Sequence, residues 1–157
     1  MIIKNLISLH DRIIIKSEFD LLGGYVDKDY GEKNYFNLPS TMPFLNSLKP
    51  IVEEAVNKKL ISVNTYMRKY VKGNTLPKHI DRSPLDVTLS IQIDKSDDII
   101  NPLIVHSNPQ VVLELKNGDG GILFGRIFYH ERPELKSDWM YNLFLHYSEI
   151  PDKKTLM

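Results

Sequence analysis

The chain has 157 residues, of which 42% are apolar and 25% charged, the composition of an ordinary globular protein with one hydrophobic core. Its 20 basic and 20 acidic side chains balance, so we expect no nucleic-acid partner. No stretch has the apolar length of a signal peptide or a membrane helix. Cysteine is absent, which excludes disulfides and thiolate metal sites and fits a cytoplasmic location.

The first 60 residues predict short strands, a loop and a helix. Residues 1–16 are expected to form one or two strands, because the run IIIK at 13–16 is rich in β-branched side chains. Residues 20–43 are rich in Gly, Asp, Asn, Pro and Tyr and predict a long loop with short pieces of structure, which can act as a lid over a site. Residues 44–59 have the three-and-four apolar spacing of a helix with one buried face, and Pro50 indicates that the regular helix starts there, because proline is tolerated in a first turn.

From residue 61 onward apolar and polar residues alternate, which is typical of β-strands. The candidate strands are 62–71, 77–81, 86–94, 101–106, 110–116, 122–130 and 140–148. Many short strands separated by turns predict a mainly β sandwich or barrel, supported on one outer face by the N-terminal helix. We expect a single domain over residues 1–157, with its core in 61–148.

The segment TLPKHID places His79 and Asp81 two residues apart. Side chains at i and i+2 of a strand share a face, so this imidazole and carboxylate can point together into a barrel mouth. The candidates for a third metal ligand are His10, His106, His130 and His146. The turn at 117–121 can carry His130 back beside His79, and two imidazoles with one carboxylate would suit Fe(II). Taken alone, an H-x-D pair is more often structural, for example an ion pair of Asp81 with Arg82 in a turn.

Three longer segments resemble a known family. Residues 66–81, YMRKYVKGNTLPKHID, residues 118–132, GDGGILFGRIFYHER, and residues 140–147, MYNLFLHY, are similar to the core strands of Fe(II)- and 2-oxoglutarate-dependent dioxygenases. The match to the pattern Y-x-x-G-x-x-L/Y-x-x-H-x-D uses Tyr70, Gly73, Leu76, His79 and Asp81. The resemblance covers about residues 62–148 and is strongest to the small prolyl-4-hydroxylase-like type.

The resemblance implies a double-stranded β-helix, a jelly-roll-like barrel of two sheets. It implies Fe(II) held by His79, Asp81 and His130, with 2-oxoglutarate and O₂ as cosubstrates. The expected reaction is hydroxylation of a peptidyl side chain or a small amino-acid-like substrate, with release of succinate and CO₂. Two other classes stay open: a non-enzymatic β-sandwich binding module, and a cupin-like metal protein that uses no oxoacid.

The sequence departs from the family pattern where 2-oxoglutarate is bound. Members commonly carry Arg or Lys at the start of the last core strand, a place that Met140 takes here. Another cation must then bind the distal carboxylate of 2-oxoglutarate. Arg68 lies two residues before Tyr70 and can share its face, so the pair is one candidate, with a two-pronged bond from the guanidinium. Arg132, two residues past His130, is the rival.

Three further residues are assigned by their place beside these motifs. Asn142 is expected to line the cosubstrate pocket. His146 shares its strand face and can line the same pocket, but we interpret it as a structural histidine. Arg82 follows Asp81 and is the candidate for contact with the substrate, although a solvated side chain would explain it equally well.

Overall fold

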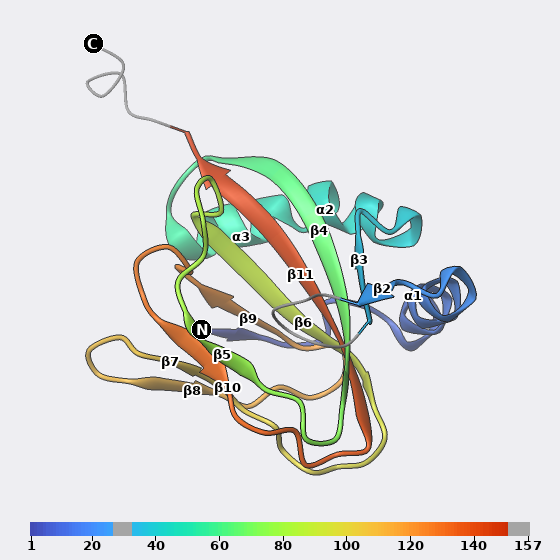
Figure 1. The fold of residues 1–157 in the computed structure, drawn as a ribbon. Helices are drawn as coiled ribbons and strands as arrows, with labels where there is room; N and C mark the ends of the chain where they lie inside the picture. The colour runs from blue at the N-terminus through green and yellow to red at the C-terminus, as the bar shows by residue number, and fades with distance from the viewer. Residues whose placement is uncertain (27–32, 151–157) are drawn as a thin grey trace.

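In the computed structural model, which describes residues 1–26 and 33–150, two antiparallel sheets face each other and the helices cover the outer face of the larger one (Figure 1). The strands of the larger sheet, in spatial order, are β1 (Ile2–Ile3), β9 (Gly120–Leu123), β6 (Val87–Lys95), β11 (Trp139–Glu149), β4 (Leu60–Val71), β3 (Lys33–Phe36) and β2 (Tyr25–Val26). Those of the smaller sheet are β5 (Leu76–His79), β10 (His130–Arg132), β7 (Leu103–Val105) and β8 (Val111–Leu113). The helical segments are α1 (Leu9–Leu22), the 3-10 turn η1 (Pro39–Thr41), α2 (Met42–Ser47) and α3 (Lys49–Val56). This arrangement confirms the predicted mainly β, jelly-roll-like fold.

The central strands of the larger sheet are buried on both faces. On β6 the apolar positions pack against the helices, as Leu89 and Ile91 do with side chains of α1, α2 and α3 in one core cluster. The alternate positions point to the other face, yet Thr88, Ser90 and Gln92 are also almost fully buried. The polar half of the alternating pattern therefore faces the space between the two sheets and not solvent. This space holds the candidate site.

The prediction of strands over residues 1–16 is wrong beyond β1, because residues 9–22 form helix α1. Ser8 caps its start, accepting a hydrogen bond from the Asp11 backbone N–H at 3.2 Å, and Gly23 ends it in a left-handed conformation. Ile15 and Phe19, four residues apart, are its buried side chains. Burial of this stripe against the sheet outweighs the β-preference of the isoleucine run.

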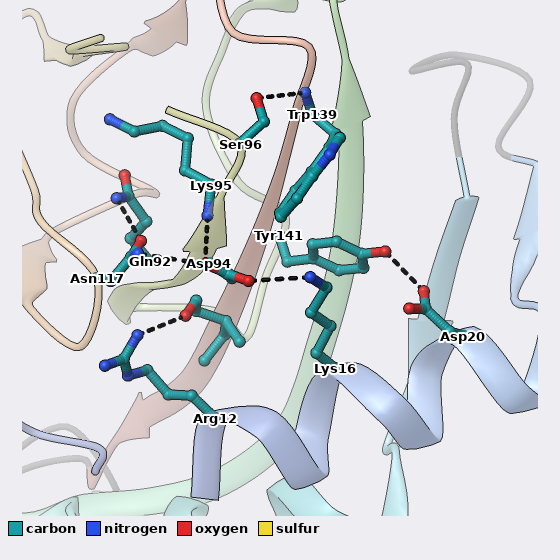
Figure 2. Close-up of polar contacts among 11 residues, drawn as sticks. Arg12, Lys16, Asp20, Gln92, Asp94, Lys95, Ser96, Asn117, Trp139 and Tyr141 are labelled. Atoms are coloured by element: carbon teal, nitrogen blue, oxygen red, sulfur yellow. Dashed lines mark hydrogen bonds and ion pairs between the residues drawn. The ribbon is translucent and has the colours of Figure 1, made fainter. Parts of the chain in front are cut away.

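Helix α1 is tied to the sheet by polar contacts at its edge (Figure 2). Arg12 donates to the carbonyl of Ile93 at 3.1 Å, and Lys16 pairs with Asp94 at 2.9 Å. One helical turn after Lys16, the carboxylate of Asp20 accepts a hydrogen bond from the hydroxyl of Tyr141 at 2.6 Å. These contacts use the ends of β6 and β11, so the helix stiffens the strands whose other face lines the space between the sheets.

The predicted helix over 44–59 is two helices, α2 and α3, that meet at Leu48. Pro50 lies in the first turn of α3, as predicted, because a proline ring is tolerated there but interrupts a continuing helix. The predicted loop over 20–43 contains the end of α1, β2, β3 and η1. Residues 27–32 of this expected lid lie outside the described residues, so its mobility stays a prediction. None of the helices in the described ranges has the length and apolar character needed to cross a membrane.

The predicted strand over 122–130 is divided between the two sheets. Strand β9 ends at Leu123 in the larger sheet, and β10 begins at His130 in the smaller one. Between them the chain turns, with the N–H groups of Ile127 and Phe128 both donating to the carbonyl of Phe124. This crossing takes His130 away from the larger sheet and places it beside β5.

Candidate functional site

His79 and His130 lie on neighbouring strands of the smaller sheet, directly opposite each other in the register of β5 and β10. Their ring centroids are 4.3 Å apart. Asp81, just past the end of β5, completes the group: one oxygen lies 3.3 Å from Nε2 of His79 and 3.2 Å from Nε2 of His130. Within the described part of the chain, these residues form a group whose potential ligand atoms all lie within 4.8 Å of one another.

Both imidazoles are oriented by backbone carbonyls two residues earlier in the chain. Nδ1 of His79 lies 2.6 Å from the Pro77 carbonyl oxygen, and Nδ1 of His130 lies 3.1 Å from that of Phe128. A carbonyl can only accept, so each Nδ1 carries a proton, and each Nε2 faces an oxygen of Asp81, where a proton or a metal ion can be held between them. Backbone contacts of this kind orient histidines that bind metals. The donor set of two Nε2 atoms and one carboxylate therefore fits a divalent ion such as Fe(II).

Asp81 is held in place by the turn after β9. Its backbone N–H donates to the carbonyl of Gly125 at 2.8 Å, and the hydroxyl of Thr88 lies 3.4 Å from its second oxygen. A Cβ atom on Gly125 would lie 2.0 Å from that oxygen, closer than any real contact. Only glycine at this position leaves room for the carboxylate, so the segment 118–132 is packed directly against the segment that carries His79 and Asp81.

The electrostatics of the group favour a charged carboxylate. Burial alone raises the pKa of Asp81, but hydrogen bonds with His130 and His79 outweigh it and hold the pKa well below its usual range. Burial lowers the pKa of His79, and the hydrogen bonds to Asp81 and to the Pro77 carbonyl overcome this, so its pKa is raised. A metal ion bound at the same place would replace protons shared with Asp81, and metal affinity would fall at acidic pH.

The group lies in a pocket of about 390 Å³ between the sheets. The lining residues are Phe36, Tyr66, Arg68, Leu76, His79, Ile80, Asp81, Arg82, Leu85, Thr88, Leu103, Leu123, His130, Phe144 and His146. This volume is in the lower part of the range of about 300–1,000 Å³ found for small-molecule sites.

Of the two candidate cations for 2-oxoglutarate, Arg68 lines this pocket and Arg132 does not. Arg68 is only 1% exposed, and its charge acts on His79. Its guanidinium lies over the ring of Tyr70 at 4.4 Å, as the shared strand face predicts. Arg132 lies 5.2 Å from the same ring, but one of its nitrogens donates to the Asn101 carbonyl at 2.6 Å. Among the described residues, none hydrogen-bonds the buried hydroxyl of Tyr70.

The other predicted residues divide between the pocket and the sheet. Asn142 pairs with Arg68 in the strand register but is fully buried, donating to the Ser90 hydroxyl at 2.9 Å, and it does not line the pocket. Arg82 is exposed and lines the pocket. His146 lines it as well, which was the alternative to interpreting it as a structural histidine. Nδ1 of His146 contacts Asn64 at 2.7 Å, and burial lowers the pKa of this histidine to about 4, so it is neutral.

Sequence reasoning missed the aromatic side chains of the pocket, Phe36, Tyr66 and Phe144. Strand parity held a signal for two of them. Tyr66 is two residues before Arg68, and Phe144 is two residues after Asn142, so each shares a face with a residue already assigned to the site. Phe36 had no such signal, because its pairing with β4 is set by the fold.

No protein-family model and no curated protein matches this sequence. Solved structures do. A viral collagen prolyl hydroxylase of Paramecium bursaria Chlorella virus-1, in complex with 2-oxoglutarate, superposes with a TM-score of 0.71 at 12% identity, covering 96% of each chain. A prolyl-4-hydroxylase of Pseudomonas putida gives 0.73 at 10% identity, covering 96% of this chain and 92% of that one. HygX of Streptomyces hygroscopicus, with nickel, 2-oxoglutarate and hygromycin B bound, gives 0.68 at 13%, covering 94% and 82%.

At these identities the likeness is one of fold, and it extends over nearly the whole chain. The structural neighbours are 2-oxoglutarate–Fe(II) oxygenases. The chain therefore has the fold of these oxygenases, a jelly-roll-like double-stranded β-helix.

Proposed function

We propose that this protein is an Fe(II)- and 2-oxoglutarate-dependent dioxygenase. The observation that carries the proposal is the convergence of His79, Asp81 and His130 in a pocket that also contains a buried arginine, Arg68. The shared fold supports it independently of these side chains.

His79, Asp81 and His130 are the proposed iron ligands. Both histidines direct Nε2 toward the proposed iron position, and the carboxylate is ionised. Each Nδ1 can keep its proton and its hydrogen bond to a backbone carbonyl when iron binds. Three ligands from the protein leave the remaining coordination positions for 2-oxoglutarate and O₂.

Arg68 is the proposed partner of the distal carboxylate of 2-oxoglutarate. A buried carboxylate needs a hydrogen-bonded cation, and Arg68 is the buried arginine of the pocket lining, whereas Arg82 is exposed. The Tyr70 hydroxyl is a second donor for the same carboxylate. The guanidinium of Arg132 lies over the Tyr70 ring, and Asn142 donates a hydrogen bond to Ser90. We assign both residues a supporting role next to the pocket.

When iron and 2-oxoglutarate are bound, the site would couple the conversion of 2-oxoglutarate and O₂ to succinate and CO₂ with insertion of one oxygen atom into a C–H bond of a second substrate. The residues of the chain position these reactants and exclude water from the space between the sheets. The proposed substrate is a peptidyl side chain or a small amino-acid-like molecule, and Arg82 at the pocket mouth is its proposed contact.

Anaerobic titration of the protein with Fe(II) and 2-oxoglutarate tests the proposal. The chelate should give a weak visible charge-transfer band that is absent in the Asp81→Ala variant. A cupin-like metal protein would bind Fe(II) without this band, and a structural β-sandwich would bind neither. Turnover in air should then form succinate, and a panel of peptides and amino acids that raises this rate would identify the substrate.

A further inference from the structure

The mouth of the pocket has a continuous aromatic wall built by strand register. Phe36 on β3 lies opposite Tyr66 on β4, and Tyr66 lies opposite Phe144 on β11. Their ring centroids are 4.6 Å and 5.9 Å apart, and the ring of His146 stacks on Phe144 at 6.3 Å and 13°. All four line the pocket. Three neighbouring strands thus present a largely apolar surface beside the candidate metal ligands, with the three aromatic rings tilted by 35° and 44° to one another.

The outer end of this wall is open to solvent. Two large apolar side chains of the pocket lining are exposed to solvent. Phe36 is 45% exposed, and Ile80, which follows strand β5, is 44% exposed. Large apolar side chains exposed at a concave rim are typical of ligand sites, because the ligand completes their burial. The surface therefore suits an apolar ring that enters from the mouth.

Arg82 contributes a positive charge to the mouth of the pocket. It is exposed and follows Asp81 directly. Arg82 lines the same pocket as the three aromatic side chains and His146. In residues 1–26 and 33–150 no carboxylate forms an ion pair with Arg82; the nearby Asp86 pairs with Arg126 at 2.6 Å. A cationic ring would be repelled by Arg82, whereas an anionic group would be attracted.

We infer that the substrate is a small acid with a flat ring, its ring against Phe36, Tyr66 and Phe144 and its carboxylate or similar anion on Arg82. The pocket of about 390 Å³ also has to contain the cosubstrate, which leaves room for a small molecule and not for a folded surface. This inference rests on the proposed function for the reaction, but the binding site it describes can be tested without turnover.

The test uses full-length protein loaded with Zn(II) and 2-oxoglutarate, so that no oxidation occurs. Binding of 3-phenylpropionate is measured by calorimetry and compared with butyrate, which has the charge without the ring, and with 3-phenylpropan-1-ol, which has the ring without the charge. We expect 3-phenylpropionate to bind about tenfold more tightly than either. Equal binding of all three, displacement of 2-oxoglutarate by the ring acid, or tighter binding of a short end-blocked peptide would overturn the inference.

Matched variants locate the site. Phe36→Ala and Arg82→Ala should each weaken 3-phenylpropionate binding about fivefold or more, in line with the loss of one rim contact, and the Arg82 effect should shrink at high salt. Tyr129→Ala and Lys116→Ala, an exposed aromatic and an exposed cation outside the pocket lining, should leave it unchanged. If the ring acid binds with this dependence but 2-oxoglutarate does not bind, the proposed reaction fails and the ring-acid site stands. If 2-oxoglutarate binds and the ring acid does not, only this inference fails.

Discussion

Replacing Gly125 by alanine should disable the candidate metal site while leaving the sheets intact. The added Cβ would lie 2.0 Å from Oδ2, 2.7 Å from Cγ and 3.3 Å from Cβ of Asp81. Normal contacts between such atoms are about 3.5–4.0 Å, so the two groups overlap by more than about 1 Å. The Asp81 N–H is bonded to the Gly125 carbonyl at 2.8 Å, so the backbones cannot separate without losing this bond. The carboxylate has to move.

The size of the effect follows from this displacement. Groups that orient metal ligands typically change metal affinity about 10–100-fold when they are altered, and here a proposed ligand itself is shifted by about 1 Å. We expect the affinity of Gly125→Ala for Fe(II) to fall by about 100-fold. Overpacking of a tight turn also costs about 1–3 kcal/mol of unfolding free energy, so the variant should stay folded but melt at a lower temperature.

The assay is an anaerobic competition titration of Fe(II) with a chromophoric chelator, together with thermal unfolding of the metal-free protein. Gly23→Ala is the control, because Gly23 has a positive φ of 80° but no atom within 4 Å of its added Cβ. It should lose about 1 kcal/mol of stability and none of its metal affinity. If Gly125→Ala binds Fe(II) as tightly as the unaltered protein, Asp81 is not a metal ligand in the position described.

Three further predictions concern the site. Asp81→Ala should abolish succinate formation with little change in melting temperature, because a residue at the pocket mouth contributes little to the core; failure to fold would indicate a structural role. Arg68→Ala should raise the apparent constant for 2-oxoglutarate about 100-fold or more, since breaking a buried charge pair costs roughly 3–5 kcal/mol, and Arg68→Lys should restore it only partly. A larger effect of Arg132→Ala would transfer the role to that residue. Burial lowers the pKa of His146 from 6.5 to about 4. Between these pH values the unfolded chain binds a proton at this residue and the folded chain does not. As the pH falls from 6.5 to 4, the unfolding free energy should therefore fall by about 3 kcal/mol. In chemical denaturation at several pH values this fall should shrink in His146→Gln, and an unchanged profile would contradict the assignment.

The long strands could be predicted from the sequence because their signal is local. Strand β4 and strand β11 lie within two residues of the predicted 62–71 and 140–148, and each carries its alternation over many residues. The short elements were less predictable. Helix α1 was missed because its isoleucine run favours a strand by propensity, while its helical signals were Ser8 at the start and Gly23 at the end. Burial against the sheet decided between them.

The sequence by itself determined the repeating β pattern, the local H-x-D pair and four candidate histidines for a third ligand, and a resemblance selected His130 among them and added the cofactors. What it could not determine was which face of each strand lies between the sheets, because β6 is buried on both sides and its polar positions face the pocket. The placing of Gly125 against Asp81, of His130 beside Arg68 and of Phe36 beside Tyr66 depends on contacts between segments about 30 to 60 residues apart in the chain. Such contacts are set by sheet register and by the packing of one sheet on the other, and these are properties of the whole fold and not of any local stretch.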